Sequence, residues 1–193
     1  MPTATSVRNA TDTTIAPQLA ERWSPRGFDA THTIEREDLL SVVEAARWAP
    51  SAGNTQPWAF VAARRGTPAF EAIQGALAGF NQIWAPAASA LLVFAVVPER
   101  AGRMQAFSAY DLGQAAAHAT VQVEHLGLNA HQMGGFDRDA LHAALSLPEG
   151  VQPVTVMAIG RHDDSDAVAP EIRERDAAAR TRLALDDVLV LVQ

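Results

Sequence analysis

Two uninterrupted apolar runs of strand length most constrain what this chain can fold into. Residues 89–97 read SALLVFAVV and residues 153–159 read PVTVMAI. A strand with one face in water alternates apolar and polar side chains, whereas a run without alternation is typical of a strand buried on both faces. We therefore expect a sheet whose central strands are covered by other elements on both sides.

Helices are expected around these runs, because the intervening segments place apolar residues at the 3.6-residue period. The residues predicted to be helical are 15–22, 35–49, 67–78, 104–126 and 137–145. Two shorter strands are predicted over 58–63 and 128–133. Gly127 is suited to end the longest helix. The chain thus interleaves helices with four short strands of mixed direction.

The 193 residues are enough for one domain with arms. Residues 1–14 are polar and lack the apolar stretch of a signal peptide, so we predict a flexible N-terminal arm. Residues 15–162 form the predicted domain, and the charged residues 163–193 form a C-terminal arm. Arms without a core of their own need a surface to lie on, and a second subunit often provides it.

Composition excludes several classes of function. The chain has no cysteine, which removes disulfides, thiolate chemistry, cysteine-ligated zinc and iron–sulfur clusters. A net charge of −7 argues against nucleic acid or an anionic membrane as the main partner. No apolar run approaches the ~18 residues of a membrane span. We expect a soluble cytoplasmic protein with a small-molecule partner.

The turn at 50–58, PSAGNTQPW, joins a predicted helix to a predicted strand. Its Ser51, Asn54 and Gln56 side chains both donate and accept hydrogen bonds. Short polar groups at the end of a rigid helix suit a planar ligand rich in heteroatoms. From the residues alone, a plain helix-to-strand connection is an equally good interpretation.

Two basic segments suit a phosphate. Arg22, Ser24 and Arg26 lie on an irregular stretch and offer planar multi-donor contacts and a hydroxyl. Arg180 and Arg182 lie near the C-terminus. If the two segments met, four positive charges would converge on one anion. Each segment alone is also typical of a solvated surface, and the sequence does not show whether they meet.

Two further features have both a structural and a functional interpretation. Gly134 and Gly135 follow a predicted strand, where their N–H groups suit a ring nitrogen or simply form a turn. Asp111 lies in a helix among small apolar residues, and either binds a ligand hydroxyl or caps a neighbouring segment. We expect no metal site, because His118 and His125 share a helix face without further ligands nearby.

Taken in order, these segments resemble the nitroreductase family of FMN-dependent oxidoreductases. The resemblance covers roughly residues 18–185 and rests on RWSPRGFD, EAARWAPSAGNTQPWAF, AYDLGQAAAHATVQVEHLGLNAHQMGGFD, PVTVMAIG and an Arg-x-Arg tail. It implies an α+β fold with a central, mostly antiparallel sheet wrapped by helices. It also implies an intertwined homodimer with extended arms, in which the C-terminal arm crosses the partner and the long helix lies at the interface.

The resemblance also implies the site. The residues implied at the FMN phosphate are Arg22, Ser24, Arg26, Arg180 and Arg182. The residues implied at the ring and ribityl chain from the other subunit are Pro50, Ser51, Ala52 and Asn54. Gly134 and Gly135 are implied beside flavin N5, and Asn81 and Asp111 near ribityl- or ring-contacting positions. No catalytic side chain is implied, because flavin N5 carries the chemistry.

The implied activity is hydride transfer from NADH or NADPH through FMN to a small acceptor such as a nitroaromatic, quinone or enone, by a ping-pong mechanism. Two departures bear on it: some members carry Glu where Gly134 stands, and the short segment 97–110 predicts an open site. The alternatives are a flavoprotein of the same fold with specialised chemistry (dehalogenation, flavin fragmentation or biosynthetic dehydrogenation), and a dimer that binds FMN without catalysis.

Overall fold

The computed structural model describes residues 9, 11–100 and 103–191. Its centre is a four-stranded sheet in the order β1-β2-β6-β5, and each neighbouring pair is antiparallel. The strands are β1 (Trp58–Arg64), β2 (Ala90–Val96), β5 (Asn129–Met133) and β6 (Gln152–Gly160). The α+β class with an antiparallel sheet is confirmed, and the expectation of mixed strand directions is wrong. The connections between β1 and β2 and between β5 and β6 return at the same end of the sheet, which makes these pairs antiparallel.

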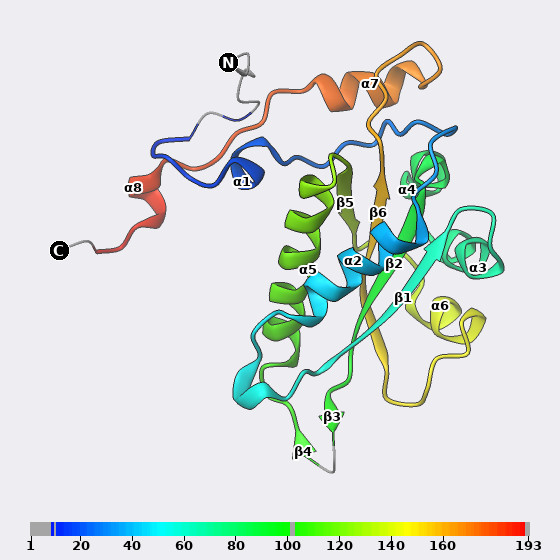
Figure 1. Cartoon of the computed structure of the whole chain (residues 1–193), viewed down its shortest axis with the longest axis vertical. Helices are drawn as coiled ribbons and strands as arrows, with labels where there is room; N and C mark the ends of the chain where they lie inside the picture. The colour runs from blue at the N-terminus through cyan, green and yellow to red at the C-terminus, as the bar shows by residue number, and fades with distance from the viewer. Residues whose placement is uncertain (1–8, 10, 101–102, 192–193) are drawn as a thin grey trace.

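Helices surround the sheet (Figure 1). They are α1 (Pro17–Glu21), α2 (Arg36–Arg47), α3 (Pro68–Ala76), α4 (Asn81–Trp84), α5 (Ser108–His125), α6 (Arg138–Ala144), α7 (Pro170–Ala177) and α8 (Leu185–Val188). Two 3₁₀ turns cover Ala52–Asn54 and Ala85–Ala87, and β3 (Glu99–Arg100) pairs with β4 (Arg103–Met104). None of the helices in the described part of the chain is long and apolar enough to cross a membrane.

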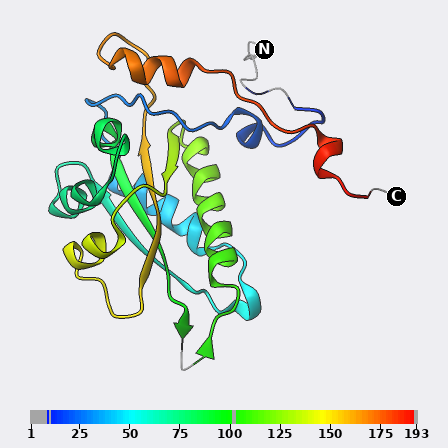
Figure 2. The ribbon, with the colours of Figure 1, turned by 180° about the vertical axis from the view of Figure 1, so that it is seen from behind.

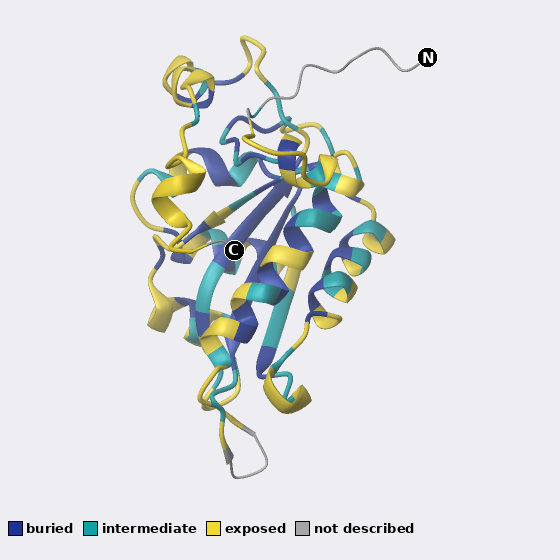
Figure 3. Ribbon diagram, turned by 90° about the vertical axis from the view of Figure 1, so that its left-hand side faces the viewer, coloured by how far each residue is buried: buried dark blue, intermediate teal, exposed yellow. Residues whose placement is uncertain are grey.

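The sheet separates two apolar clusters. Helices α2 and α5 pack on one face, and α3, α4 and α6 lie on the other (Figures 1 and 2). All seven residues of β2 are buried, as the unbroken apolar run predicts. Figure 3 shows the buried strands between helices whose outer faces are exposed. Burial of β2 on both faces is the consequence of these two helical layers.

Local signals account for several element ends. The Thr67 hydroxyl accepts a hydrogen bond from the Phe70 amide at the start of α3, and Asp137 caps α6 through Ala140 N. Gly127 has a φ of 71° and ends α5, as predicted. The predicted start of α5 at residue 104 is wrong, because Met104 belongs to β4 and the helix begins at Ser108.

Residues 11–16 run beside residues 178–188, away from the sheet (Figures 1 and 2). The Leu185 amide donates to Asp12 Oδ2 at 3.3 Å. Within the predicted arm 163–193, Val168 and Ile172 still pack in the core, and the chain leaves the body after Ala177. The predicted flexible N-terminal arm at 1–14 lies mostly outside the described residues, which omit 1–8 and 10.

Candidate functional site

The first basic segment borders a cavity on the outer side of α5 and β5. Arg22 Nη2 donates to Ser24 Oγ at 3.1 Å, and both residues line this cavity of about 370 Å³. The remaining lining residues come from α1, α5 and β5: Leu19, Ala117, Thr120, Val121, Ala130 and Gln132. Arg22 and Ser24 therefore face a hollow between the first helix, the long helix and an edge strand.

The second basic segment meets the first. Arg180 Nη1 donates to the Arg22 carbonyl at 2.9 Å, and Arg22, Arg180 and Arg182 line an adjoining cavity of about 230 Å³. Arg26 lines neither of these two cavities, and its guanidinium lies 3.9 Å from the Asp176 carboxylate. Three of the four predicted positive charges thus converge, and the fourth has an acidic neighbour.

One buried donor in this corner lacks an acceptor. Arg22 Nε is buried and has no hydrogen-bond partner among the described residues. Burial raises the pKa of Glu124 above its usual range, and the positive charge of the nearby Arg22 opposes this shift only in part. A buried donor without an acceptor is costly. An anionic ligand in the adjoining cavities would supply the missing acceptor.

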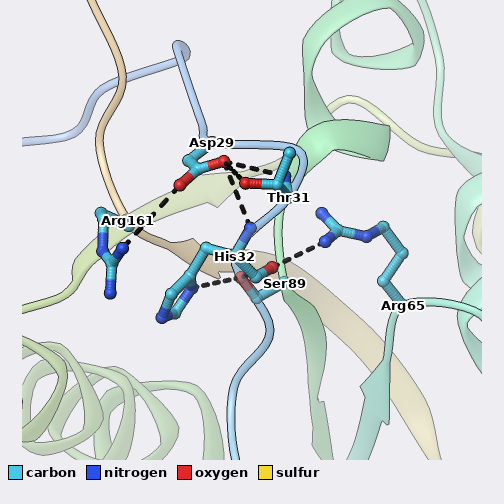
Figure 4. A network of polar contacts seen from close by, with 6 residues as sticks. All are labelled: Asp29, Thr31, His32, Arg65, Ser89 and Arg161. Atoms are coloured by element: carbon cyan, nitrogen blue, oxygen red, sulfur yellow. Dashed lines mark hydrogen bonds and ion pairs between the residues drawn. The ribbon is translucent and has the colours of Figure 1, made fainter.

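A polar network fixes the chain that follows the first basic segment (Figure 4). Asp29 Oδ1 accepts hydrogen bonds from the Thr31 amide at 2.8 Å and from its hydroxyl at 2.6 Å. These bonds lower the pKa of Asp29, and Arg161, just after β6, lies 3.9 Å from the same carboxylate. The irregular segment is thereby tied to the end of β6.

The same network reaches the ends of β1 and β2. The carbonyl of His32 accepts hydrogen bonds from Arg65 Nη2 at 2.6 Å and from Ser89 Oγ at 3.0 Å. Because the Ser89 hydroxyl donates to this carbonyl, it accepts from the His32 Nδ1–H at 2.8 Å. Burial lowers the pKa of His32 below its ordinary value. Sequence reasoning missed this network, since its members come from segments far apart in the chain.

The loop before β1 is held from two sides. Ser51 Oγ accepts a hydrogen bond from the Gln56 amide at 3.0 Å. Asp111, which is 2% exposed in the first turn of α5, accepts from the Ala52 amide at 3.1 Å. Asp111 thus holds a neighbouring segment, which is one of the two roles that the sequence left open for it.

This loop also has an unusual backbone. Gly53, Asn54 and Gln56 have φ angles of 58°, 57° and 49°, in the left-handed region. Glycine and asparagine tolerate this region, whereas glutamine rarely adopts it. A glutamine in this region costs about 1–3 kcal/mol, and strained residues of this kind cluster at binding sites, where the surrounding structure enforces them. The hydrogen bonds at Ser51 and Asp111 are the contacts that hold the loop in this form.

The paired glycines lie past the end of β5 and are exposed. The Gly135 carbonyl accepts hydrogen bonds from Asn81 Nδ2 at 3.1 Å and from the Ala78 amide at 2.9 Å. A Cβ on Gly135 would lie 2.9 Å from Asn81 Nδ2, whereas a Cβ on Gly134 would meet nothing within 4 Å. Neither glycine has a positive φ, so glycine is not required here by the backbone conformation. What the two glycines provide is the space that a side chain would fill.

Within one chain the predicted site residues form three separate groups. The cavity of about 370 Å³ is lined by Ala117, Thr120 and Val121 of α5, whereas Asp111, which binds the 50–54 loop, lies six to ten residues earlier on this helix, about 9–15 Å along its axis. The glycines with Asn81 form the third group. Sequence reasoning missed Thr120 and Gln132, which line the cavity; Gln132 Nε2 donates a hydrogen bond to Thr120 Oγ1 at 3.2 Å. The alternation of side chains along β5 was the signal that could have placed Gln132 on the same face of the strand as Ala130, which also lines the cavity.

No group of three or more metal-ligating side chains occurs among the residues that the structure describes. The positive cavities, the strained loop and the open glycines together suit an anionic organic ligand with a planar part.

The model of the nitroreductase family matches residues 19–83 and 67–161. A crystal structure reported as an oxidoreductase containing FMN is 32% identical, with a TM-score of 0.87 over 97% of this chain and 96% of that one. An uncharacterized 15.4 kDa protein of Mycolicibacterium smegmatis is 38% identical over 119 residues, 62% of this chain and 80% of that protein. An Archaeoglobus fulgidus protein, provisionally named NADH dehydrogenase/NAD(P)H nitroreductase, is 29% identical over 135 residues, 68% of this chain and 76% of its own. The chain belongs to the nitroreductase family.

Proposed function

We propose that this protein is an FMN-dependent oxidoreductase that passes hydride from NADH or NADPH to a small organic acceptor such as a nitroaromatic, quinone or enone. The observation that carries the proposal is the convergence of Arg22, Arg180 and Arg182 on adjoining cavities beside the unpaired Arg22 Nε. The 32% identity to an oxidoreductase containing FMN and the name of the Archaeoglobus relative support it.

The residues present fit FMN. Arg22, Ser24, Arg180 and Arg182 would hold the phosphate by charge-assisted hydrogen bonds, with Arg26 at the edge of the same segment. The strained loop, through Pro50, Ser51, Ala52 and Asn54, would contact the ring and ribityl chain bound to the other subunit. Asn81, Asp111, Gly134 and Gly135 complete the proposed site.

FMN, when bound, supplies the two-electron hydride chemistry. The protein's part is to orient the ring, to exclude water and to leave one face open. The free space at Gly134 would admit the nicotinamide and then the acceptor to the same position in turn, which is the ping-pong order. No side-chain nucleophile or metal ligand set is needed for this cycle.

A homodimer is part of the proposal, as the resemblance to the nitroreductase family implies, and exposed apolar side chains are available for its interface. Large apolar side chains are exposed near the end of α2 and the start of α5: Trp48 (71%), Met104 (74%), Phe107 (61%) and Tyr110 (68%). Exposed apolar clusters of this kind mark interfaces. We propose that residues 15–162 form the FMN-binding domain and that residues 163–193 cross the partner, where the exposed Leu183 and Val188 would be buried.

The proposal is tested on purified protein reconstituted with FMN and freed of excess cofactor. We expect flavin absorption in the visible spectrum that bleaches with NADPH or NADH in the absence of oxygen and returns when an acceptor is added. Initial rates at several donor and acceptor concentrations should give the parallel double-reciprocal lines of a ping-pong cycle.

Other outcomes separate the alternatives. Absence of flavin absorption after reconstitution would refute the proposed function. Bleaching without turnover of nitroaromatics, quinones or enones would favour specialised flavin chemistry. Stoichiometric FMN that stays oxidised with both nicotinamides would favour a binding dimer without catalysis.

A further inference from the structure

Asp176, near the end of α7, is a buried acidic residue that the proposed chemistry does not use. It is 8% exposed, and its carboxylate accepts hydrogen bonds from the backbone of a distant turn. The Arg26 amide lies 2.8 Å from Oδ2 and 3.0 Å from Oδ1, and the Gly27 amide lies 2.7 Å from Oδ2. Successive backbone N–H groups form a concavity that binds anions, and here the anion is the protein's own carboxylate.

The opposite side of the same turn is held by β5. His131 Nδ1 lies 2.9 Å from the Pro25 carbonyl, and since a carbonyl only accepts, the ring donates. Burial lowers the pKa of His131, so that the ring is neutral near pH 7. Gly27 leaves no space for a side chain, because a Cβ there would lie 2.4 Å from the Asp163 carbonyl oxygen. The turn is therefore held by Asp176 of α7 and by His131 of β5, and it packs closely against Asp163.

The turn and the arginine cavities belong to one unit. Four residues after Asp176, the guanidinium of Arg180 donates to the carbonyl of Arg22. The C-terminal segment thus binds the backbone of the first basic segment on both sides of Ser24: the Asp176 carboxylate after it and the Arg180 guanidinium before it. Displacement of the carboxylate would move the backbone that carries the Ser24 and Arg22 side chains.

We propose that Asp176 is a positioning residue for the phosphate site: by holding the Arg26 and Gly27 amides, it sets the direction in which Arg22 and Ser24 present their donors. The inference rests on the proposed FMN function. It assigns to α7 a role in ligand choice, since only ligands with a phosphate use these donors. Riboflavin, which has the same ring and ribityl chain without the phosphate, is the matched probe.

The test measures the dissociation constants of FMN and riboflavin by quenching of flavin fluorescence. Asp176→Asn removes the charge and one acceptor position, whereas Gly27→Ala leaves the carboxylate intact and displaces the turn, because its Cβ would overlap the Asp163 carbonyl oxygen. Glu174→Gln is the control, because Glu174 is an exposed acidic residue on the same helix, α7. We expect both test variants to bind FMN about tenfold more weakly, with riboflavin affinity unchanged within about twofold.

Each outcome decides the matter. Wild-type protein that binds FMN no more tightly than riboflavin would refute the phosphate site and the proposed function with it. If the wild type prefers FMN and the variants keep that preference, or lose affinity for both flavins equally, only the role of Asp176 is overturned. Failure of both variants to fold also overturns it, because a positioning residue leaves the fold intact.

Discussion

Replacement of Arg22 by alanine is the single substitution that tests the proposed phosphate site most directly. Its guanidinium borders both cavities, donates to Ser24 Oγ through Nη2 and has a buried Nε without a partner. A hydrogen bond to a charged group contributes about 1.5–3 kcal/mol. Loss of one such bond to the phosphate therefore weakens FMN binding by roughly 10- to 150-fold.

Isothermal titration of the apoprotein with FMN and with riboflavin measures this loss. Arg22→Ala is expected to lower FMN affinity and to leave riboflavin affinity nearly unchanged. Arg138→Ala, which removes an exposed arginine from α6, is the control for net charge. Arg22→Lys keeps the charge without the planar fork, so it should fall between the wild type and alanine.

Urea unfolding of each apoprotein separates a binding defect from a folding defect. The Arg22→Ala variant loses its bond to Ser24, so a small decrease in the free energy of unfolding is expected, about 0.5–1.5 kcal/mol. FMN affinity equal to that of the wild type in a folded variant would refute the reasoning, because the phosphate would then lie elsewhere.

Three further predictions concern the rest of the site. Gly135→Ala should lower the free energy of unfolding in urea by about 1 kcal/mol, because its Cβ displaces the Asn81 amide. Gly134→Ala should leave the stability of the apoprotein unchanged and weaken flavin binding. Equal effects of the two variants on stability would refute this prediction. Asp111→Ala should destabilise the protein by about 1–3 kcal/mol and Asp111→Asn by less, and equal losses would contradict its bond to the loop. Because the pKa of His131 is lowered in the folded protein, its neutral ring contributes stability above pH 6.5, and this contribution is lost as the pH falls through the folded pKa. The free energy of unfolding of His131→Gln should therefore depend less on pH below 6.5 than that of the wild type. The same pH dependence in both proteins would refute this prediction.

The sheet and main helices could be predicted because their signals are local. The unbroken apolar run of β2, the Asp137 cap and the terminating Gly127 each act within a few residues. The predicted start of α5 is wrong, because Glu99–Arg100 pairs with Arg103–Met104 and this strand pairing overrides the helical propensity of the sequence. The four-residue helix α4 is too short to show a period.

The candidate site could be predicted only as residue types. Arginines, a hydroxyl and glycines are recognisable in the sequence, but their contacts depend on the fold. Asp176 bonds to an amide 150 residues away, so no spacing indicates it. The left-handed conformation of Gln56 is equally hidden, because glutamine does not favour it and the bond to Ser51 helps to hold it.

A mixed dimer tests the two-subunit flavin site most directly. Arg22→Ala and Asn54→Ala each damage every site of their own homodimer. When equal amounts of the two variants are unfolded and refolded together, each heterodimer should contain one doubly altered site and one intact site. The account predicts that about one quarter of all sites regain wild-type FMN affinity. No recovery in confirmed heterodimers would show that one subunit supplies both residues and would contradict the account.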